Sequence, residues 1–257
     1  MKTYQIFLAG DECLDVYQYG WVERISPEAP VPIFRFSHEE TRPGMAGNVR
    51  ANLINLNCLV NDSDYHRTKD ITTKTRLIDL KSKQQLIRID NDVKVKPMTW
   101  SESNSNINMF DAVVVSDYDK GSVSYEFIQE LRQRYQGPIF VDTKKTDLAR
   151  LEGFIVKINE FEYARLRSEC TELVVTLGHG GAKYKEQVYK TIDIEVTDTC
   201  GAGDTFLAAM VRGYLDHKDL GPAIEFANLA AAVTVKHIGV YAPSFEEINR
   251  NPRPYAG

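Results

Sequence analysis

The sequence reads D-T-C-G-A-G-D-T-F over residues 198–206, directly before a long apolar segment with helical spacing. Gly201, Ala202 and Gly203 have small side chains or none, so the backbone there can approach a ligand closely. Because they open a helix, their N–H groups would lie at its positive end, which stabilises phosphoryl oxygens. Asp204 in the same turn could accept a proton from an attacking hydroxyl. The stretch predicts an anion pocket and a base together, although Asp also favours helix caps and an isolated G-A-G-D would fit a cap equally well.

Outward from this motif, strand-like and helical segments alternate. Strands are expected at 4–9, 112–116, 138–142, 173–177 and 192–196, and helices at 47–56, 124–135, 203–214 and 222–237. This alternation predicts an α/β fold with a mostly parallel central sheet and helices on its faces. Two further strand-like stretches, 31–36 and 73–90, have no following helix, and we expect them to form a small separate sheet, a lid. The prediction is one domain over residues 1–257, with lid strands from approximately 16–36 and 73–92.

Composition excludes several classes of protein. A chain of 257 residues, 43% of them hydrophobic, can bury one sizeable core. Its net charge of -5 argues against a nucleic-acid partner or a polybasic membrane anchor. The 4 cysteines and 5 histidines are scattered, which favours free thiols in a reducing compartment over a disulfide framework or a zinc site. With no signal peptide and no run long enough to span a bilayer, we expect a cytoplasmic protein without a membrane partner.

Two other phosphate-binding signatures are missing from the sequence: it has no G-x-x-x-x-G-K-[ST] loop and no H-R-D or D-F-G set. By contrast, residues 198–206 match completely the D-T-x-G-A-G-D-x-F signature of ribokinase-like (PfkB) carbohydrate kinases. This resemblance implies a ribokinase-like three-layer sandwich that uses ATP and Mg²⁺. It also implies that Asp204 is the catalytic base and that Gly201, Ala202 and Gly203 stabilise the transferring phosphoryl group.

Other stretches of the chain indicate a narrower group within this family. The residues G-D-E-C-L-D at 10–15, R-I-S-P-E-A-P-V-P at 24–32 and S-D-Y-D-K-G at 116–121 are similar to those of bacterial heptose-7-phosphate kinases of ADP-heptose synthesis. The implied activity is transfer of the ATP γ-phosphoryl group to the anomeric oxygen of D-glycero-D-manno-heptose 7-phosphate. Two alternatives stay open: a PfkB-type kinase for another sugar, or a catalytically silent binding protein. Met45 in place of the family's second glycine, and the short segments 57–73 and 163–171, favour these alternatives.

On the sugar side, the resemblance implies that Asp15 bonds sugar hydroxyls and that Gly44 and Asn48 belong to the sugar-binding pattern. A phosphorylated sugar also needs cations, and the lid region supplies four candidates: Arg24, Lys74, Arg76 and Arg88. Lys and Arg also protect strand edges from aggregation, so each of the four has a surface role as an alternative. Asp15 could likewise be a loop or cap residue.

On the nucleotide side, the resemblance implies a set of residues around ATP: Lys144, Asn159, Thr176, Gly178, Gly181 and Asn228. Glu162, in an N-x-x-E pair with Asn159, would organise Mg²⁺ through water, or is simply a Glu at a helix start. Lys144 is otherwise a solvated lysine, the T-x-G-x-x-G stretch at 176–181 a turn that ends a strand, and Asn228 a crosslink between helices.

The lid strands would expose unpaired edges and an apolar face if the chain were alone. We therefore expect a two-fold homodimer formed through the lid, with a sugar phosphate and ATP as the small-molecule partners.

Overall fold

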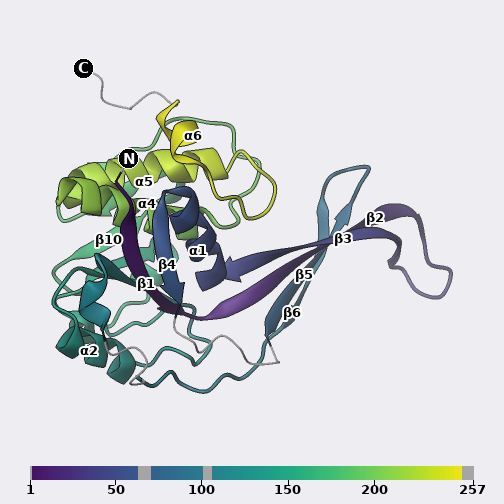
Figure 1. The fold of residues 1–257 in the computed structure, drawn as a ribbon. Coiled ribbons are helices and arrows are strands. Elements are labelled where there is room, and N and C mark those ends of the chain that lie inside the picture. The colour runs from purple at the N-terminus through teal and green to yellow at the C-terminus, as the bar shows by residue number, and fades with distance from the viewer. Residues whose placement is uncertain (1, 63–70, 101–105, 251–257) are drawn as a thin grey trace.

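The computed structural model describes residues 2–62, 71–100 and 106–250. These residues form a three-layer α/β body from which a second sheet projects to one side (Figure 1). The sheet of the body has the strand order β12-β11-β10-β9-β8-β7-β1-β4. Neighbours from β10 to β4 pair in parallel, and only the β10-β11 and β11-β12 pairs are antiparallel. The predicted α/β fold with a mostly parallel sheet is confirmed.

The strands of the body alternate with helices along the chain. They are β1 (Tyr4–Gly10), β4 (Cys58–Asp62), β7 (Ala112–Asp117), β8 (Ile139–Thr143), β9 (Ile155–Asn159), β10 (Leu173–Thr176), β11 (Ala182–Tyr184) and β12 (Gln187–Tyr189). Strand β7 is buried along its whole length. Its run of three valines suits a central parallel strand, because such a strand is covered on both faces.

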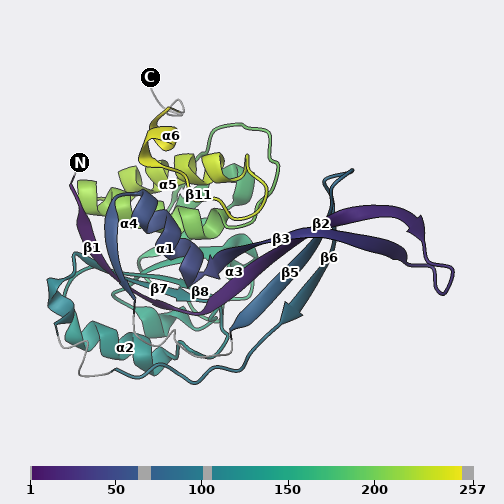
Figure 2. The same cartoon turned by 45° about the vertical axis from the view of Figure 1, so that its right-hand side comes forward.

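Helices cover both faces of this sheet (Figure 2). One face carries α1 (Ala46–Asn55), α4 (Ala202–His217) and α5 (Leu220–Thr234), with α6 (Phe245–Asn249) packed on α5. The other face carries α2 (Tyr125–Arg134), whose buried residues join a second apolar cluster. A short helix, α3 (Glu160–Tyr163), directly follows β9.

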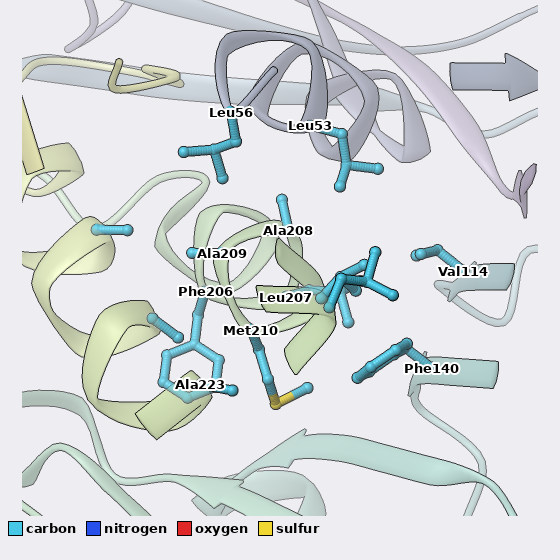
Figure 3. Close-up of a cluster of buried hydrophobic side chains, with 14 of the residues drawn as sticks. Leu53, Leu56, Val114, Phe140, Phe206, Leu207, Ala208, Ala209, Met210 and Ala223 are labelled. Carbon is cyan, nitrogen blue, oxygen red and sulfur yellow. The ribbon is translucent and has the colours of Figure 1, made fainter. Parts of the chain in front are cut away.

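Helix α4 is the centre of the larger core, and its packing fixes the position of its first turn. Leu207 lies toward Val114 and Phe140 of the sheet (Figure 3). At Gly213 an added Cβ would lie 2.9 Å from Cα of Ala223, so the glycine lets α4 and α5 approach closely. Asp204, in the first turn, is therefore carried by a helix that is buried on several sides.

The second sheet has the order β3-β2-β5-β6 and contains β2 (Glu12–Ile25), β3 (Pro32–Met45), β5 (Thr72–Asp79) and β6 (Gln85–Asn91). We call these four strands the lid sheet. Its first two strands reach well beyond the expected range 16–36. The extra part of β3 is mostly polar and exposed, and an exposed edge strand needs no apolar alternation, so pattern alone did not reveal it.

One predicted element is wrong: residues 192–196 do not form a strand. The next residues, Thr197 and Asp198, donate their N–H groups to the carbonyl oxygen of Val235 at 2.8 and 3.2 Å. The segment thus leads past the end of α5 rather than along a strand edge. Alternating residues describe a suitable side-chain pattern, but a strand also needs a neighbour with free backbone groups.

The two segments that are short by comparison with the family pattern differ in structure. The 57–73 segment supplies β4 and the start of β5, while its residues 63–70 lie outside the described residues. The 163–171 segment begins at the end of α3, which has 4 residues. Among the described residues, none of the helices has the length and apolar character needed to cross a bilayer.

Candidate active site

The turn before α4 brings Asp204 into a buried position. Gly201 adopts φ 76°, a left-handed conformation that favours glycine, and α4 begins directly after it. A Cβ at Gly201 would lie 2.7 Å from Nδ2 of Asn48, so glycine is also required for close packing. The first turn of a helix leaves backbone N–H groups without intrahelical partners, and those of Gly203 and Asp204 make the turn a potential anion site. The N–H of Ala202 donates to the carbonyl oxygen of Thr199 at 3.3 Å.

The Asp204 carboxylate is held by two side chains from distant parts of the chain. Asn48 of α1 donates to Oδ2 at 2.8 Å, and the hydroxyl of Tyr118, just after β7, donates to Oδ1 at 2.7 Å. Asp204 lies inside the helix, and the residue at the N-cap position is Gly201. The helix-cap interpretation of Asp204 is therefore wrong, since its carboxylate oxygens accept from side chains rather than cap the helix.

Burial raises the pKa of Asp204 to about 6, although the hydrogen bonds from Asn48 and Tyr118 lower it. Among the smaller contributions to this pKa, the nearby charge of Asp142 raises it and that of Lys157 lowers it. A carboxyl group with a pKa this close to neutrality combines a large ionised fraction at pH 7 with useful basicity, which is the compromise that general bases need.

A buried lysine completes this part of the site, and it was not among the residues predicted from the sequence. Lys157, in β9, pairs with Asp142 of β8 at 2.8 Å. An added Cβ on Gly203 would lie 3.0 Å from the Lys157 ammonium, so the cation lies against the start of α4. Burial alone would lower the pKa of Lys157, but the Asp142 carboxylate outweighs it and the net direction is upward. A lysine between apolar residues of the buried strand Ile155–Asn159 was the available signal.

On the lid side, the strand register groups several of the predicted sugar residues. Asp15 is the Cα partner of Lys74, and Arg76 is the partner of Arg88, so these side chains point to one face of the lid sheet. Arg76 donates to the buried Asp15 carboxylate. Gly44, opposite Cys13, packs directly against Asp15, and a Cβ there would overlap the carboxylate.

The four lid cations differ in what holds them. Arg76 forms an ion pair with Asp15, and Arg88 donates to Asp90 at 2.8 and 3.0 Å. Lys74 lies with its ammonium 5.5 Å from the centre of the Tyr118 ring, beside the candidate base. Arg24 is exposed near the end of β2, so the lid places it apart from the other three.

The predicted nucleotide residues lie around the ends of β8, β9 and β10. Asn159 and Glu162 form a capping box on α3, in which each side chain accepts from the backbone N–H of the other. Glu162 also pairs with Lys144 at 2.5 Å, and the Lys144 side chain is exposed, so a solvated lysine remains the alternative to a role at the nucleotide phosphates. Glu162 thus fits the helix-start alternative and still faces the site through Lys144.

The remaining predicted residues have structural partners. Thr176 donates its hydroxyl to the carbonyl of Ile158 at 3.3 Å, and Asn228 donates to the carbonyl of Tyr189 at 2.8 Å. Asn228 therefore crosslinks α5 to β12. Gly178 and Gly181 both have positive φ, 56° and 90°, as the tight turn after β10 requires.

The donors near Asp204 suit a magnesium ion only in part. Asp142 and Glu162 are each paired with a lysine. No group of three or more His, Cys, Asp or Glu side chains that could hold a metal was found within residues 2–62, 71–100 and 106–250. Mg²⁺ commonly binds through one or two carboxylates, waters and substrate phosphates. The residues present therefore fit an ion that arrives with a nucleotide, with Glu162 as the nearest candidate to contact it through water.

Comparison with known proteins defines the class. Residues 57–247 match the family model described as pfkB family carbohydrate kinase. The chain belongs to this family and is a carbohydrate kinase. Its fold is that of Arabidopsis thaliana ribokinase, solved with ribose and ATP (TM-score 0.69, 15% identity, 97% of this chain and 98% of that one). It also resembles phosphofructokinase-2 from Escherichia coli, solved with substrates and products (TM-score 0.72, 17% identity, 96% and 97%).

Among curated proteins, the chain is similar to proteins named Bifunctional protein HldE. It is 33% identical to the one from a Nitratiruptor species over an alignment of 304 residues with its gaps, which covers 97% of this chain and 65% of that protein. It is 31% identical to the one from Helicobacter pylori (strain Shi470) over 302 residues, with 95% and 65% covered. The chain thus spans just under two thirds of the length of these relatives. The predicted resemblance to ribokinase-like (PfkB) carbohydrate kinases is confirmed.

Proposed function

We propose that the protein transfers the γ-phosphoryl group of ATP to the anomeric hydroxyl of D-glycero-D-manno-heptose 7-phosphate. The observation that carries the proposal is the Asp204 carboxylate, buried at the start of α4 beside the turn of Gly201 to Gly203, with a pKa raised to about 6 by burial. A base and an anion pocket in one turn are what phosphoryl transfer to a hydroxyl requires.

In the proposed reaction, Asp204 takes the proton of the anomeric hydroxyl as its oxygen forms a bond to the γ-phosphorus. The bond from that phosphorus to the bridging oxygen of ADP breaks. The N–H groups at the start of α4 and the Lys157 ammonium stabilise charge on the transferring group. Mg²⁺, when bound with ATP, would neutralise part of the phosphate charge. Closure of the lid sheet would exclude water and limit ATP hydrolysis.

The sugar would lie between Asp15, Gly44 and Asn48. Asp15 is fixed by Arg76 on one side, and Gly44, which has no side chain, leaves the space that the Asp15 carboxylate occupies. Because Arg76 and Arg88 already have carboxylate partners, Lys74 is the lid cation best suited to the phosphate of the sugar. The choice of a heptose 7-phosphate is supported by the resemblance of residues 10–15, 24–32 and 116–121 to heptose-7-phosphate kinases.

A panel assay tests this proposal. ATP consumption would be measured with heptoses and with hexoses or pentoses, each with and without a terminal phosphate, and the product would be identified by phosphorus NMR. We expect turnover with the heptose 7-phosphate and formation of a 1,7-bisphosphate. Equal turnover of the phosphorylated and unphosphorylated heptose would contradict a phosphate pocket. If ATP were consumed with no sugar of the panel, the result would favour a catalytically silent binding protein.

One observation favours a different sugar as the second candidate. Met45 has φ 55° and ψ -128° and is buried, at the residue where the family's sugar-binding pattern has a glycine. This backbone region is unfavourable for residues with a side chain. A methionine kept there can reshape the neighbouring sugar pocket, in which case the panel would show its best turnover with a sugar other than the heptose.

We also propose that the lid sheet pairs with a second copy of the chain. The face opposite Lys74 and Arg76 exposes Ile87 and Ile89, each about half accessible, and β3 and β6 are at the sheet's edges. Exposed apolar faces and free edges favour association. Light scattering at micromolar concentration should give a dimer, and a monomer would contradict the proposal. Replacing Ile89 by Lys should shift the equilibrium to monomer, whereas Leu59→Lys, on the far edge strand β4, should not.

A further inference from the structure

Tyr118 contacts the candidate base but has no part in the reaction as proposed above. Its hydroxyl donates to Oδ1 of Asp204, and Asn48 donates to Oδ2. Each carboxylate oxygen therefore receives one hydrogen bond and keeps a further lone pair for the proton of a substrate. Because the two donors act on different oxygens, they fix the rotation of the carboxylate about its own axis.

The loop that carries Tyr118 is itself held by a buried carboxylate. Asp11, just after β1, is 2% exposed and accepts from the backbone N–H groups of Tyr118 at 2.8 Å and Lys120 at 3.2 Å. The hydroxyl and the N–H of Ser122 also donate to Asp11. A side chain whose supporting loop has several hydrogen bonds to one buried group is preorganised rather than free to rotate away.

The ring of Tyr118 meets both halves of the site. The ammonium of Lys74, from strand β5 of the lid sheet, is 5.5 Å from the ring centre, and that of Lys144, which follows β8, is 5.0 Å away. Both distances are within the range of cation–π attraction. Tyr118 therefore contacts the base, a cation of the sugar side and a cation of the nucleotide side at once.

We propose that Tyr118 is a positioning residue for phosphoryl transfer: its hydroxyl orients the Asp204 carboxylate and favours the ionised form, and Asp11 holds its loop in place. The inference rests on the proposed role of Asp204 as the base. A hydroxyl that donates to a carboxylate stabilises the charged form, so its removal favours protonation of the carboxylate.

The groups that face Asp204 set the expected direction of this effect. Besides Asn48 and Tyr118, they are Asp142 of β8, which raises the pKa of Asp204, and Lys157 of β9, which lowers it. Cys13 of β2 also lies near Asp204 and stays neutral, because burial raises the pKa of its thiol to about 12. Burial raises the pKa of Tyr118 well above its usual value, so its hydroxyl remains a donor throughout the working range of pH. Without this donor, only Asn48 and Lys157 lower the pKa of Asp204, while burial and Asp142 still raise it.

The test is a carbon-13 NMR titration of Asp204 in the free enzyme, with the signal assigned through Asp204→Asn. In Tyr118→Phe the titration midpoint should rise by about one pH unit, the size expected for one hydrogen bond to a charged group. The acid limb of kcat for the heptose 7-phosphate should move up with it. The matched control is Tyr4→Phe, because Tyr4 also donates to a carboxylate, that of Asp216 at 2.9 Å, at the opposite end of α4. This control should leave the Asp204 midpoint unchanged.

A second measurement keeps the ring and hydroxyl of Tyr118 in place. Uniform replacement of tyrosine by 3-fluorotyrosine makes the phenol more acidic and a stronger donor, and should lower the Asp204 midpoint. An unchanged midpoint in both Tyr118→Phe and the fluorinated protein would overturn the positioning role. Failure of the proposed function gives a different result: Asp204→Asn would then turn over at the wild-type rate, whatever the titration of Asp204 shows.

Discussion

The turn at the start of α4 buries its charged groups, whereas the lid sheet buries one ion pair, that of Arg76 and Asp15, and leaves others partly exposed. At α4, Asp204 and Lys157 are buried, and their partners come from α1, β8 and the loop after β7. On the lid sheet, Arg88 pairs with Asp90 two residues away on the same strand, and both are partly exposed. Buried charges act strongly on one another, whereas exposed pairs contribute little. We infer that the α4 turn performs the chemistry and that the lid sheet selects the sugar.

The largest effect should come from the base. Asp204→Asn keeps the shape of the side chain but removes the basic carboxylate, so kcat should fall by about 10²–10⁴-fold while ATP affinity is retained. Steady-state kinetics with the sugar chosen by the panel would measure this. If the variant kept more than about a tenth of the wild-type kcat, Asp204 would not be the base, and the proposed division of roles between the α4 turn and the lid sheet would be wrong.

Lys157 tests whether the cation beside Gly203 takes part in the same chemistry. Lys157→Met keeps most of the side chain's volume but removes the charge, and kcat should fall about 10²-fold, as for the loss of one group that stabilises a developing anion. The variant leaves Asp142 buried without its partner, so the double variant with Asp142→Asn is needed as a control for folding. Normal kcat in a folded double variant would limit Lys157 to a structural role.

The lid should affect binding of the sugar rather than the chemical step. Lys74→Ala should weaken binding of a phosphorylated sugar by about 1.5–3 kcal/mol, the range for hydrogen bonds to charged groups, with little change in ATP binding. Calorimetric titration would measure both affinities. Arg24→Ala, the matched exposed cation near the end of β2, should have a smaller effect. A larger loss for Arg24 than for Lys74 would reverse the assignment of the phosphate site.

The smallest effect concerns stability. Because the folded pKa of Asp204, about 6, lies above its ordinary value of 3.8, this carboxyl contributes most to stability when protonated, and that contribution is lost as pH rises through 6. At pH 7.5, the melting temperature of Asp204→Asn should therefore be a few degrees above that of the wild type. The gain in the free energy of unfolding should be at most about 3 kcal/mol. At pH 4 the difference should largely disappear. Thermal unfolding at the two values of pH would detect this, and a lower melting temperature at pH 7.5 would contradict the buried charge.

The sequence predicted some parts of the molecule better than others for physical reasons. The α4 turn was readable because its function depends on neighbouring residues: Gly201 supplies positive φ and Asp204 follows three residues later. Asn48 and Tyr118 lie 156 and 86 residues from Asp204, and only the packing of α1 and β7 on α4 brings them there. Tyr118 stood in a recognised stretch but had no assigned role, since a tyrosine in a loop carries no local mark of its partner.

Other differences between expectation and structure have the same origin. Arg76 was one of four candidate cations for a substrate phosphate, with a surface role as the alternative, and the register of β2 and β5 instead buries it beside Asp15, to which it donates. At residues 192–196 the side chains do alternate, but the predicted strand is wrong. A strand needs an adjacent strand to pair with, and the sequence of the segment does not specify one. The sequence therefore predicted the chemistry that depends on neighbouring residues, but it did not predict the pairing between distant segments.

The most direct test of the central claim, that a buried carboxylate of raised pKa is the base, is the pH dependence of the single-turnover rate at saturating ATP and sugar. The rate constant for phosphoryl transfer should be constant above pH 7 and fall about tenfold per pH unit below 6, following protonation of Asp204. A rate that stays constant from pH 7 down to pH 5 in the folded enzyme would contradict the account.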